Sequence, residues 1–162
     1  MASVMAFDPS TRSTGWSFWM NGELRMAGVL RAKNLEAMME MLLLWEPPRF
    51  VYDVVAVERP EIYTPTKAVA NPNKVQQLSI VAGACAMRAG WTGKLLMPYP
   101  QQWKGSVPKH VTEMQMKRKV GGQWAEIEKI LNQQLKTSRD DVADAIALGV
   151  WAHEKERLSI LT

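Results

Sequence analysis

The sequence has a single cysteine, Cys85, and two histidines that lie far apart in the chain. A structural zinc site usually needs four Cys or His ligands, so this composition argues against one. One cysteine also excludes an internal disulfide framework, and Cys85 lies in a run of small residues that is typical of a reduced protein core. Any metal ion in this protein would therefore be held by oxygen ligands.

Long apolar segments are also missing. The longest purely apolar run, Met41 to Trp45, has five residues, whereas a membrane-spanning helix needs about 20. The N-terminus lacks the basic region and sustained apolar stretch of a secretory signal. We therefore expect a cytoplasmic protein with no membrane segment.

Acidic residues are scarce in one part of the chain. Residues 88–139 contain ten Lys and Arg but three Glu, a local net charge of +7, while the whole chain carries +4. The remaining residues therefore carry −3, and a positive segment on a mildly acidic body predicts a polyanionic partner. The alternative is a lysine-rich helix surface that only faces solvent.

The pattern of apolar residues predicts one mixed-sheet α/β domain over residues 1–162. A buried strand at Val4–Phe7 is followed by a polar turn and a second β-rich run, which together predict a hairpin. Continuous apolarity in both this strand and 53–58 predicts strands covered on both faces, as in a parallel sheet. Further strands are expected at 23–30 and 94–97, and helices at 35–46, 74–89, 108–119, 124–135 and 140–153. The first of these helices is apolar on most of its circumference and should be well covered.

Each of the two apolar strands ends in an acid. Asp8 closes the first strand and Glu58 closes the second, so parallel strands would bring both carboxylates to the same edge of the sheet. A carboxylate there is costly to bury unless a cation meets it. The alternative for Asp8 is an ordinary cap of the Pro-Ser-Thr turn that follows it.

Two further acids share one face of the last predicted helix. Asp141 and Asp144 are three residues apart, so their side chains project together. Ser138 with Asp141 fits a capping box, and first-turn acids favour the helix dipole, which accounts for Asp140 and Asp141. Asp144 lies a turn further in, among apolar residues, and needs another reason.

Four carboxylates from three elements would form an oxygen-rich pocket of the kind that Mg²⁺ requires. Two such ions, about 4 Å apart, can activate a water molecule, polarise a phosphate and stabilise the leaving oxygen. Hydrolysis by metal-bound water needs no Ser, Cys or His nucleophile, and the sequence offers no convincing one. The set Asp8, Glu58, Asp141 and Asp144 therefore predicts metal-dependent phosphodiester hydrolysis.

A turn-rich loop at 99–110 interleaves aromatic and basic residues, among them Trp103, Lys104 and Lys109. Such loops suit contact with nucleic acid through phosphate pairing and stacking, although an ordinary connecting loop is the alternative. Arg12, Tyr63, Lys67, Lys117 and Arg118 are further candidates for DNA contact.

Three segments carry a resemblance to a known family: Ala6-Phe-Asp8-Pro9-Ser10-Thr-Arg12-Ser-Thr-Gly15-Trp16, Val55-Ala-Val-Glu58-Arg-Pro60 and Asp141-Val-Ala-Asp144-Ala-Ile-Ala-Leu148. In this order they resemble the RuvC family of Holliday-junction resolvases, of the RNase H-like superfamily, and its compact phage-type members most. The chain departs from the family pattern at Ser10, where glycine is usual, and at Glu61, where cellular members have an aromatic residue.

The resemblance implies an RNase H-like fold with a five-stranded mixed sheet flanked by helices. It also implies a homodimer that resolves branched DNA, the four-way Holliday junction, by paired symmetrical nicks in DNA recombination and repair. Two Mg²⁺ ions per site, replaceable by Mn²⁺, would be held by the four acids, with no small-molecule cofactor. The family's basic residues after the fifth strand match Lys104 and Lys109. A phage-encoded member would act in the host cytoplasm.

Other functions remain open from the residues alone. The same fold could serve a nuclease acting on RNA or on other branched DNA, because metal-dependent hydrolysis of a phosphodiester does not distinguish ribose from deoxyribose. A catalytically silent nucleic-acid-binding module would keep the basic segment without needing all four acids. An ATP-binding domain of the actin and sugar-kinase type would carry glycine-rich phosphate loops and a duplicated body, and this sequence has neither.

Overall fold

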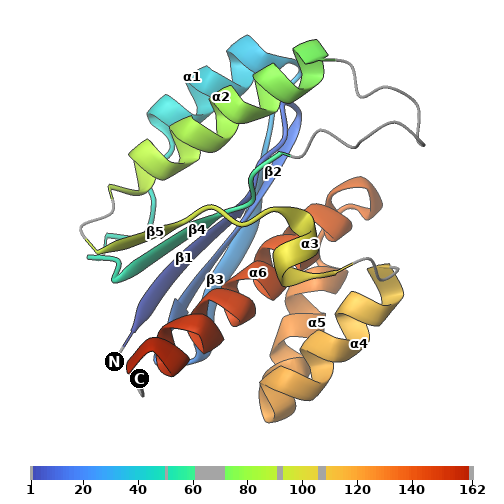
Figure 1. Ribbon diagram of the computed structural model, residues 1–162. Helices are drawn as coiled ribbons and strands as arrows, with labels where there is room; N and C mark the ends of the chain where they lie inside the picture. The colour runs from blue at the N-terminus through green and yellow to red at the C-terminus, as the bar shows by residue number, and fades with distance from the viewer. Residues whose placement is uncertain (1, 50, 61–71, 91–92, 106–108, 161–162) are drawn as a thin grey trace.

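The computed structural model describes residues 2–49, 51–60, 72–90, 93–105 and 109–160, and it contains a five-stranded sheet between two layers of helices (Figure 1). The strands are β1 (Ser3–Asp8), β2 (Ser13–Met20), β3 (Glu23–Arg31), β4 (Val54–Val57) and β5 (Lys94–Leu96). The helices are α1 (Leu35–Leu44), α2 (Pro72–Ala89), α3 (Pro100–Trp103), α4 (Lys109–Val120), α5 (Trp124–Asn132) and α6 (Lys136–Ile160). A short 3₁₀ turn, Gly121–Gln123, joins α4 to α5. The predicted mixed-sheet α/β fold is confirmed.

The sheet has the order β3-β2-β1-β4-β5, with β1 in the middle. Adjacent strands β1, β2 and β3 are antiparallel, as the predicted meander requires, while β4 and β5 run parallel to β1. Every side chain of Val4–Phe7 and Val54–Val57 is buried. The continuous apolar runs therefore predicted correctly that these two strands are covered on both faces.

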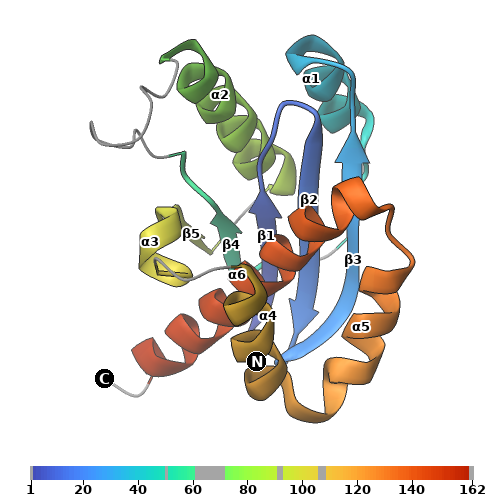
Figure 2. The same ribbon diagram turned by 90° about the vertical axis from the view of Figure 1, so that its right-hand side faces the viewer.

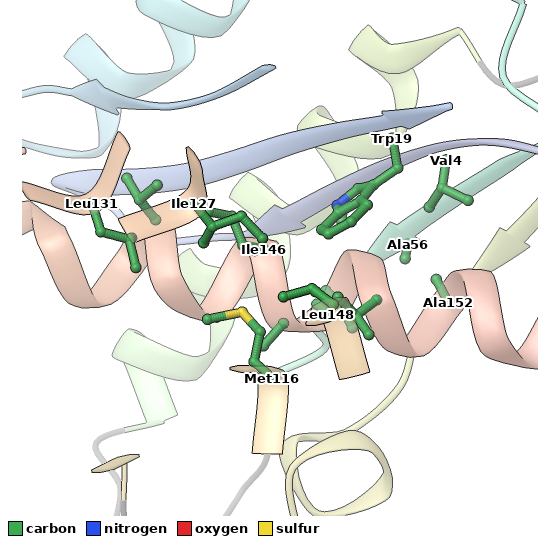
Figure 3. Close-up of a cluster of buried hydrophobic side chains, with 14 of the residues drawn as sticks. Val4, Trp19, Ala56, Met116, Ile127, Leu131, Ile146, Leu148 and Ala152 are labelled. Carbon is green, nitrogen blue, oxygen red and sulfur yellow. The ribbon is translucent and has the colours of Figure 1, made fainter. Parts of the chain in front are cut away.

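The two faces of the sheet have separate cores. Helices α1 and α2 cover one face, and α6 with α4 and α5 covers the other; Figure 2 shows α6 crossing the sheet. In the second core, Trp19 and Val4 of the sheet pack near Ile146 and Leu148 of α6 (Figure 3). None of the helices in the described part of the chain is long and apolar enough to cross a membrane.

Helix α1 begins as predicted, because the Asn34 side chain accepts a hydrogen bond from the backbone N–H of Ala37 at 3.0 Å. The helix ends at Leu44, two residues earlier than expected. The expectation that it is well covered is wrong for the single chain, since Leu43 and Leu44 are 75% and 78% exposed. In the described part of the chain, the neighbours of α1 leave these two side chains uncovered.

The last helix is longer than predicted at both ends. It begins at Lys136, so Ser138 lies within its first turn and is not the residue that caps it. Ser138 is buried, and its hydroxyl has no hydrogen-bond partner among the described residues. The predicted capping box is therefore wrong. Asp141 is not a first-turn residue, and another role is needed for it.

Candidate active site

The ladder between β1 and β4 places the first two acids side by side. Phe7 pairs with Val57, and the backbone N–H of Glu58 donates to the carbonyl of Phe7 at 3.0 Å. Asp8 ends β1 and Glu58 follows β4 directly, so both lie at the same edge of the sheet. The prediction drawn from the two acid-ended strands is confirmed.

Helix α6 brings the other two acids to this edge because it packs directly on the backbone of β2. The buried Ser17 hydroxyl donates to the carbonyl of Ala145 at 2.7 Å. Gly15 leaves room for the helix, since a Cβ on it would lie 2.0 Å from the Asp141 carbonyl oxygen. Gly149 does the same two turns on, where a Cβ would lie 2.1 Å from Nε1 of Trp19. Two glycines and one small hydroxyl residue therefore fix the position of the helix.

Asp141 is oriented by Ser13, the first residue of β2. The hydroxyl of Ser13 donates to Oδ2 of Asp141 at 2.5 Å. This contact joins residues 128 positions apart in the sequence, and the sequence pattern did not indicate it. The Asp141 carboxylate is therefore held by this hydrogen bond, and not by a capping box.

Lys104 joins two of the acids. Its Nζ lies 3.4 Å from Oε2 of Glu58 and 3.2 Å from Oδ2 of Asp144. The three side chains are only 14% to 23% exposed, so water screens these ion pairs weakly. Trp103, the last residue of α3, donates from Nε1 to the same Glu58 oxygen at 2.8 Å. The C-terminal end of α3 and the residue that follows it therefore supply a hydrogen-bond donor and an ammonium.

The four acids, called here the carboxylate cluster, influence one another electrostatically. Burial raises the pKa of Asp8 well above its usual range, and the negative charges of Glu58, Asp144 and Asp141 raise it further. Burial also raises the pKa of Glu58, against the opposing effects of Lys104 and the Trp103 hydrogen bond. The cluster therefore concentrates more negative charge than its surroundings neutralise.

Burial by itself would lower the pKa of Lys104. The charges of Asp144, Glu58 and Asp8 outweigh that effect and raise the pKa, so Lys104 is a cation at neutral pH. Its charge partly balances the cluster.

Solved structures with this architecture include several resolvases of Holliday junctions. Thermus thermophilus RuvC in complex with a Holliday junction matches with a TM-score of 0.59 and 18% identity, over 96% of each chain. The yeast mitochondrial Holliday junction resolvase matches with a TM-score of 0.61 and 15% identity, over 98% of this chain and 81% of the other. The fowlpox virus resolvase in complex with its junction matches with a TM-score of 0.56 and 18% identity, over 99% of both chains.

The chain has the RuvC-type fold. The RNase H-like architecture expected from the three sequence segments is thereby confirmed over nearly the whole length. No protein-family model and no curated protein matches the sequence.

In this RuvC-type fold, the chemistry of the carboxylate cluster suits a hard divalent cation. All of its donors are oxygens, and a bound cation would favour the ionised form of Asp8, whose pKa is raised by burial first and by the neighbouring acids second. Among the described residues, no three Asp, Glu, His or Cys side chains already stand close enough to hold one ion together. Lys104 lies between two of the acids instead. The donor set therefore has the oxygen chemistry that a hard cation such as Mg²⁺ prefers.

The remaining candidates for DNA contact lie in different places. Arg12 is exposed in the turn between β1 and β2, four residues after Asp8. Lys117 and Arg118 are exposed near the far end of α4, where the neighbouring Lys119 and Val120 line a cavity with Trp19. The structure thus does not bring these two basic residues to the cluster.

Three candidates cannot be placed by their side chains. Tyr63 and Lys67 lie outside the described residues, as does Glu61. Lys109 is the first residue of α4, but its side chain also lies outside the described part.

The sequence reasoning missed part of the site. Trp103 was predicted to contact DNA, yet its indole N–H is engaged by Glu58. Ser13, Gly15 and Ser17 position Asp141 and α6. The small residues in the first half of β2, a strand otherwise rich in aromatics, were the available signal for a close helix approach.

Proposed function

We propose that this protein is a structure-selective endonuclease that resolves four-way DNA junctions by paired, symmetrical nicks. The observation that carries the proposal is the carboxylate cluster at one edge of a RuvC-type sheet, with Lys104 beside it. Proteins of this fold from Thermus thermophilus and fowlpox virus have been solved with Holliday junctions, which supports branched DNA as the substrate. Such a protein would act where nucleic acid is accessible, in the cytoplasm.

The proposed cofactor is Mg²⁺, two ions per site, with Mn²⁺ as a substitute. Asp8, Glu58, Asp141 and Asp144 would hold the ions. When bound, they would supply the activated water and the stabilisation of the leaving oxygen that phosphodiester hydrolysis requires.

The side chains around the cluster prepare it for a phosphate. Trp103 holds one oxygen of Glu58, and Ser13 holds one oxygen of Asp141, so these carboxylates keep their orientation as the substrate arrives. Lys104 is a cation within reach of the cluster, and it would pair with the phosphate next to the bond that is cut. Exposed Arg12 and the proposed contacts of Lys109 would add binding to the DNA backbone.

Paired nicks require two sites, and we propose a homodimer that forms through α1 and α2. These helices share an exposed apolar groove of about 260 Å³, whose lining includes Met39, Leu43, Ala84 and Met87. Leu43 and Met87 are 75% and 72% exposed in the single chain. Apolar side chains that are exposed together on one face are typical of an association surface. A two-fold axis would place the same face of each copy together.

Met87→Asp should shift the mass measured by sedimentation at micromolar concentration from about twice the chain mass to that of one chain. Leu158→Asp is the matched control, because Leu158 is also exposed but lies near the end of α6. A wild-type chain that stays monomeric while nicking both strands together would contradict the dimer.

The function itself is tested by comparing substrates side by side. Purified protein with Mg²⁺ should cut a synthetic four-way junction in two opposed strands and leave linear duplex uncut. Flaps, three-way branches and RNA–DNA hybrids should be cut far more slowly. Preferred cutting of the hybrid would favour the alternative, a ribonuclease of the same fold. Binding without cutting of any substrate would favour a silent binding module.

A further inference from the structure

A second groove lies along the open edge of the sheet, between β5, α3 and α6. It has a volume of about 510 Å³, and its lining includes Arg59, Gln102, Trp151 and Lys155 together with apolar residues of β5 and its extension. We call it the β5 groove. The sequence motifs gave none of these four residues a role.

The β5 groove is positive. Arg59 and Lys155 are its two charged lining residues, and both are exposed cations. Glu156, an acid next to Lys155 in the sequence, forms an ion pair with Lys94, whose Nζ lies 3.6 Å from its Oε2. A groove with this charge favours an anionic occupant.

Aromatic rings accompany both cations. The Arg59 guanidinium lies 3.9 Å from the centre of the Tyr99 ring, and the Lys155 ammonium lies 5.9 Å from the centre of the Trp151 ring. Trp151 is partly exposed and lines the groove itself. Grooves that combine aromatic faces with cations bind single-stranded nucleic acid, because bases stack on the rings while the backbone meets the charges.

The β5 groove is aligned with the carboxylate cluster along α6. Trp151 and Lys155 follow Asp144 by 7 and 11 residues, so all three lie within about 20° of one line along α6. Trp151 is about 10 Å and Lys155 about 16 Å along the helix from Asp144. On the opposite wall, Arg59 follows Glu58 directly. A strand that leaves the cluster along α6 would enter the groove.

We infer that the β5 groove binds an unpaired DNA strand next to the cut, with a base stacked on Trp151 and phosphates held by Arg59 and Lys155. The inference rests on the proposed nuclease function for its substrate. It adds a binding site that guides one strand after the duplex arms separate at the branch point.

The test measures binding of a short fluorescent oligothymidylate and of a linear duplex by the full chain carrying Asp8→Asn, which prevents cutting. Trp151→Leu keeps an apolar side chain but removes the stacking surface, so affinity for the oligothymidylate should fall roughly five- to a hundredfold. Trp151→Phe keeps an aromatic face and should restore most of it. Duplex binding should change little in either variant.

Lys155→Ala should weaken oligothymidylate binding and lower the slope of log affinity against log salt by about 0.7, the value for one phosphate contact on a single strand. Lys129→Ala is the matched control, because Lys129 is an exposed lysine on α5, away from the groove. Equal effects of these two substitutions would indicate general charge attraction and overturn the proposal. Unchanged oligothymidylate binding by Trp151→Leu would also overturn it.

Cutting of four-way junctions by the wild-type chain is measured separately. If junctions are cut but Trp151 and Lys155 do not affect oligothymidylate binding, the groove proposal fails and the proposed function stands. If the groove variants behave as expected in a chain that cuts no junction, the proposed function fails instead.

Discussion

The close approach of α6 to β2 can be tested by adding one methyl group at Gly15. In Gly15→Ala, the new Cβ would lie 2.0 Å from the carbonyl oxygen of Asp141 and 2.5 Å from its carbonyl carbon, whereas ordinary contacts begin at 3.4 Å. Both partners are backbone atoms, so no rotation of a side chain relieves the overlap. The helix must move away by about 1.4 Å, the difference between the two distances.

A shift of this size should affect cutting more than folding. Overpacking of this kind costs about 3 kcal/mol, which lowers the melting temperature of a domain of this length by roughly 6–12 °C. Misplacing reacting groups by about 1 Å costs on the order of a hundredfold in rate. Gly15→Ala should therefore cut four-way junctions about a hundredfold more slowly at temperatures where it remains folded.

The assay compares single-turnover junction cutting with the melting temperature of each variant. Gly149→Ala is the matched control. Gly149 lies on the same helix as Asp141, about 12 Å further along it, and its new Cβ would overlap the Trp19 side chain of β2. Gly122→Ala, with no atoms within 4 Å of the new Cβ, should change neither property. If Gly15→Ala and Gly149→Ala lose stability and cutting in the same proportion, α6 does not position Asp141 as described.

Four further predictions concern the charged residues. Asp144→Asn should reduce cutting by orders of magnitude while junction binding in Ca²⁺ survives, whereas exposed Asp140→Asn should cut normally; the reverse would place the wrong acid in the cluster. Because burial raises the pKa of Asp8, metal-free wild-type protein should gain stability from this group as the pH falls through the raised value toward 3.8. Asp8→Asn should therefore melt above wild type at pH 7, and the gap should close on acidification; equal melting at pH 7 would refute this. Hydrogen bonds from β1 lower the pKa of Asp53, so its contribution has the opposite sign: it is present above pH 3.8 and is lost as the pH falls through the lowered pKa. Asp53→Asn should then lower the melting temperature at neutral pH but leave cutting unchanged, and a loss of cutting would contradict its structural role. Lys104→Ala should weaken junction binding and reduce its salt slope by about one phosphate contact, and an unchanged slope would show that Lys104 only balances the cluster.

The strand-end acids could be predicted because their signal is local. An apolar run that ends in a carboxylate fixes both the burial of the strand and the edge at which the acid emerges, and this pattern occurs at Asp8 and again at Glu58. The pairing of Asp141 with Asp144 followed from helix phase alone. These inferences needed no knowledge of tertiary contacts.

The parts that could not be predicted depend on contacts between distant segments. Trp103 and Lys104 reach Glu58 across about 45 residues, and nothing in the local pattern of their loop indicates that target. Serine is a residue type that often caps helices, yet Ser138 is buried and lies inside α6, which begins two residues earlier. The apolar pattern of α1 predicts that Leu43 is covered, but it does not tell whether the cover comes from the same chain or from another molecule.

Asp8 and Lys104 are attached to parts of the molecule that differ in how easily they can open. Asp8 ends the middle strand of the sheet, whose amides should exchange with solvent only when the whole domain unfolds. Lys104 follows α3, a single turn of four residues near the sheet edge, whose amides should exchange through local opening. Displacement of that one turn would remove the positive charge from the cluster while the backbone beneath Asp8 stays folded. Local opening of α3 alone can thus change the charge of the site, and such opening is much faster than unfolding of the whole domain.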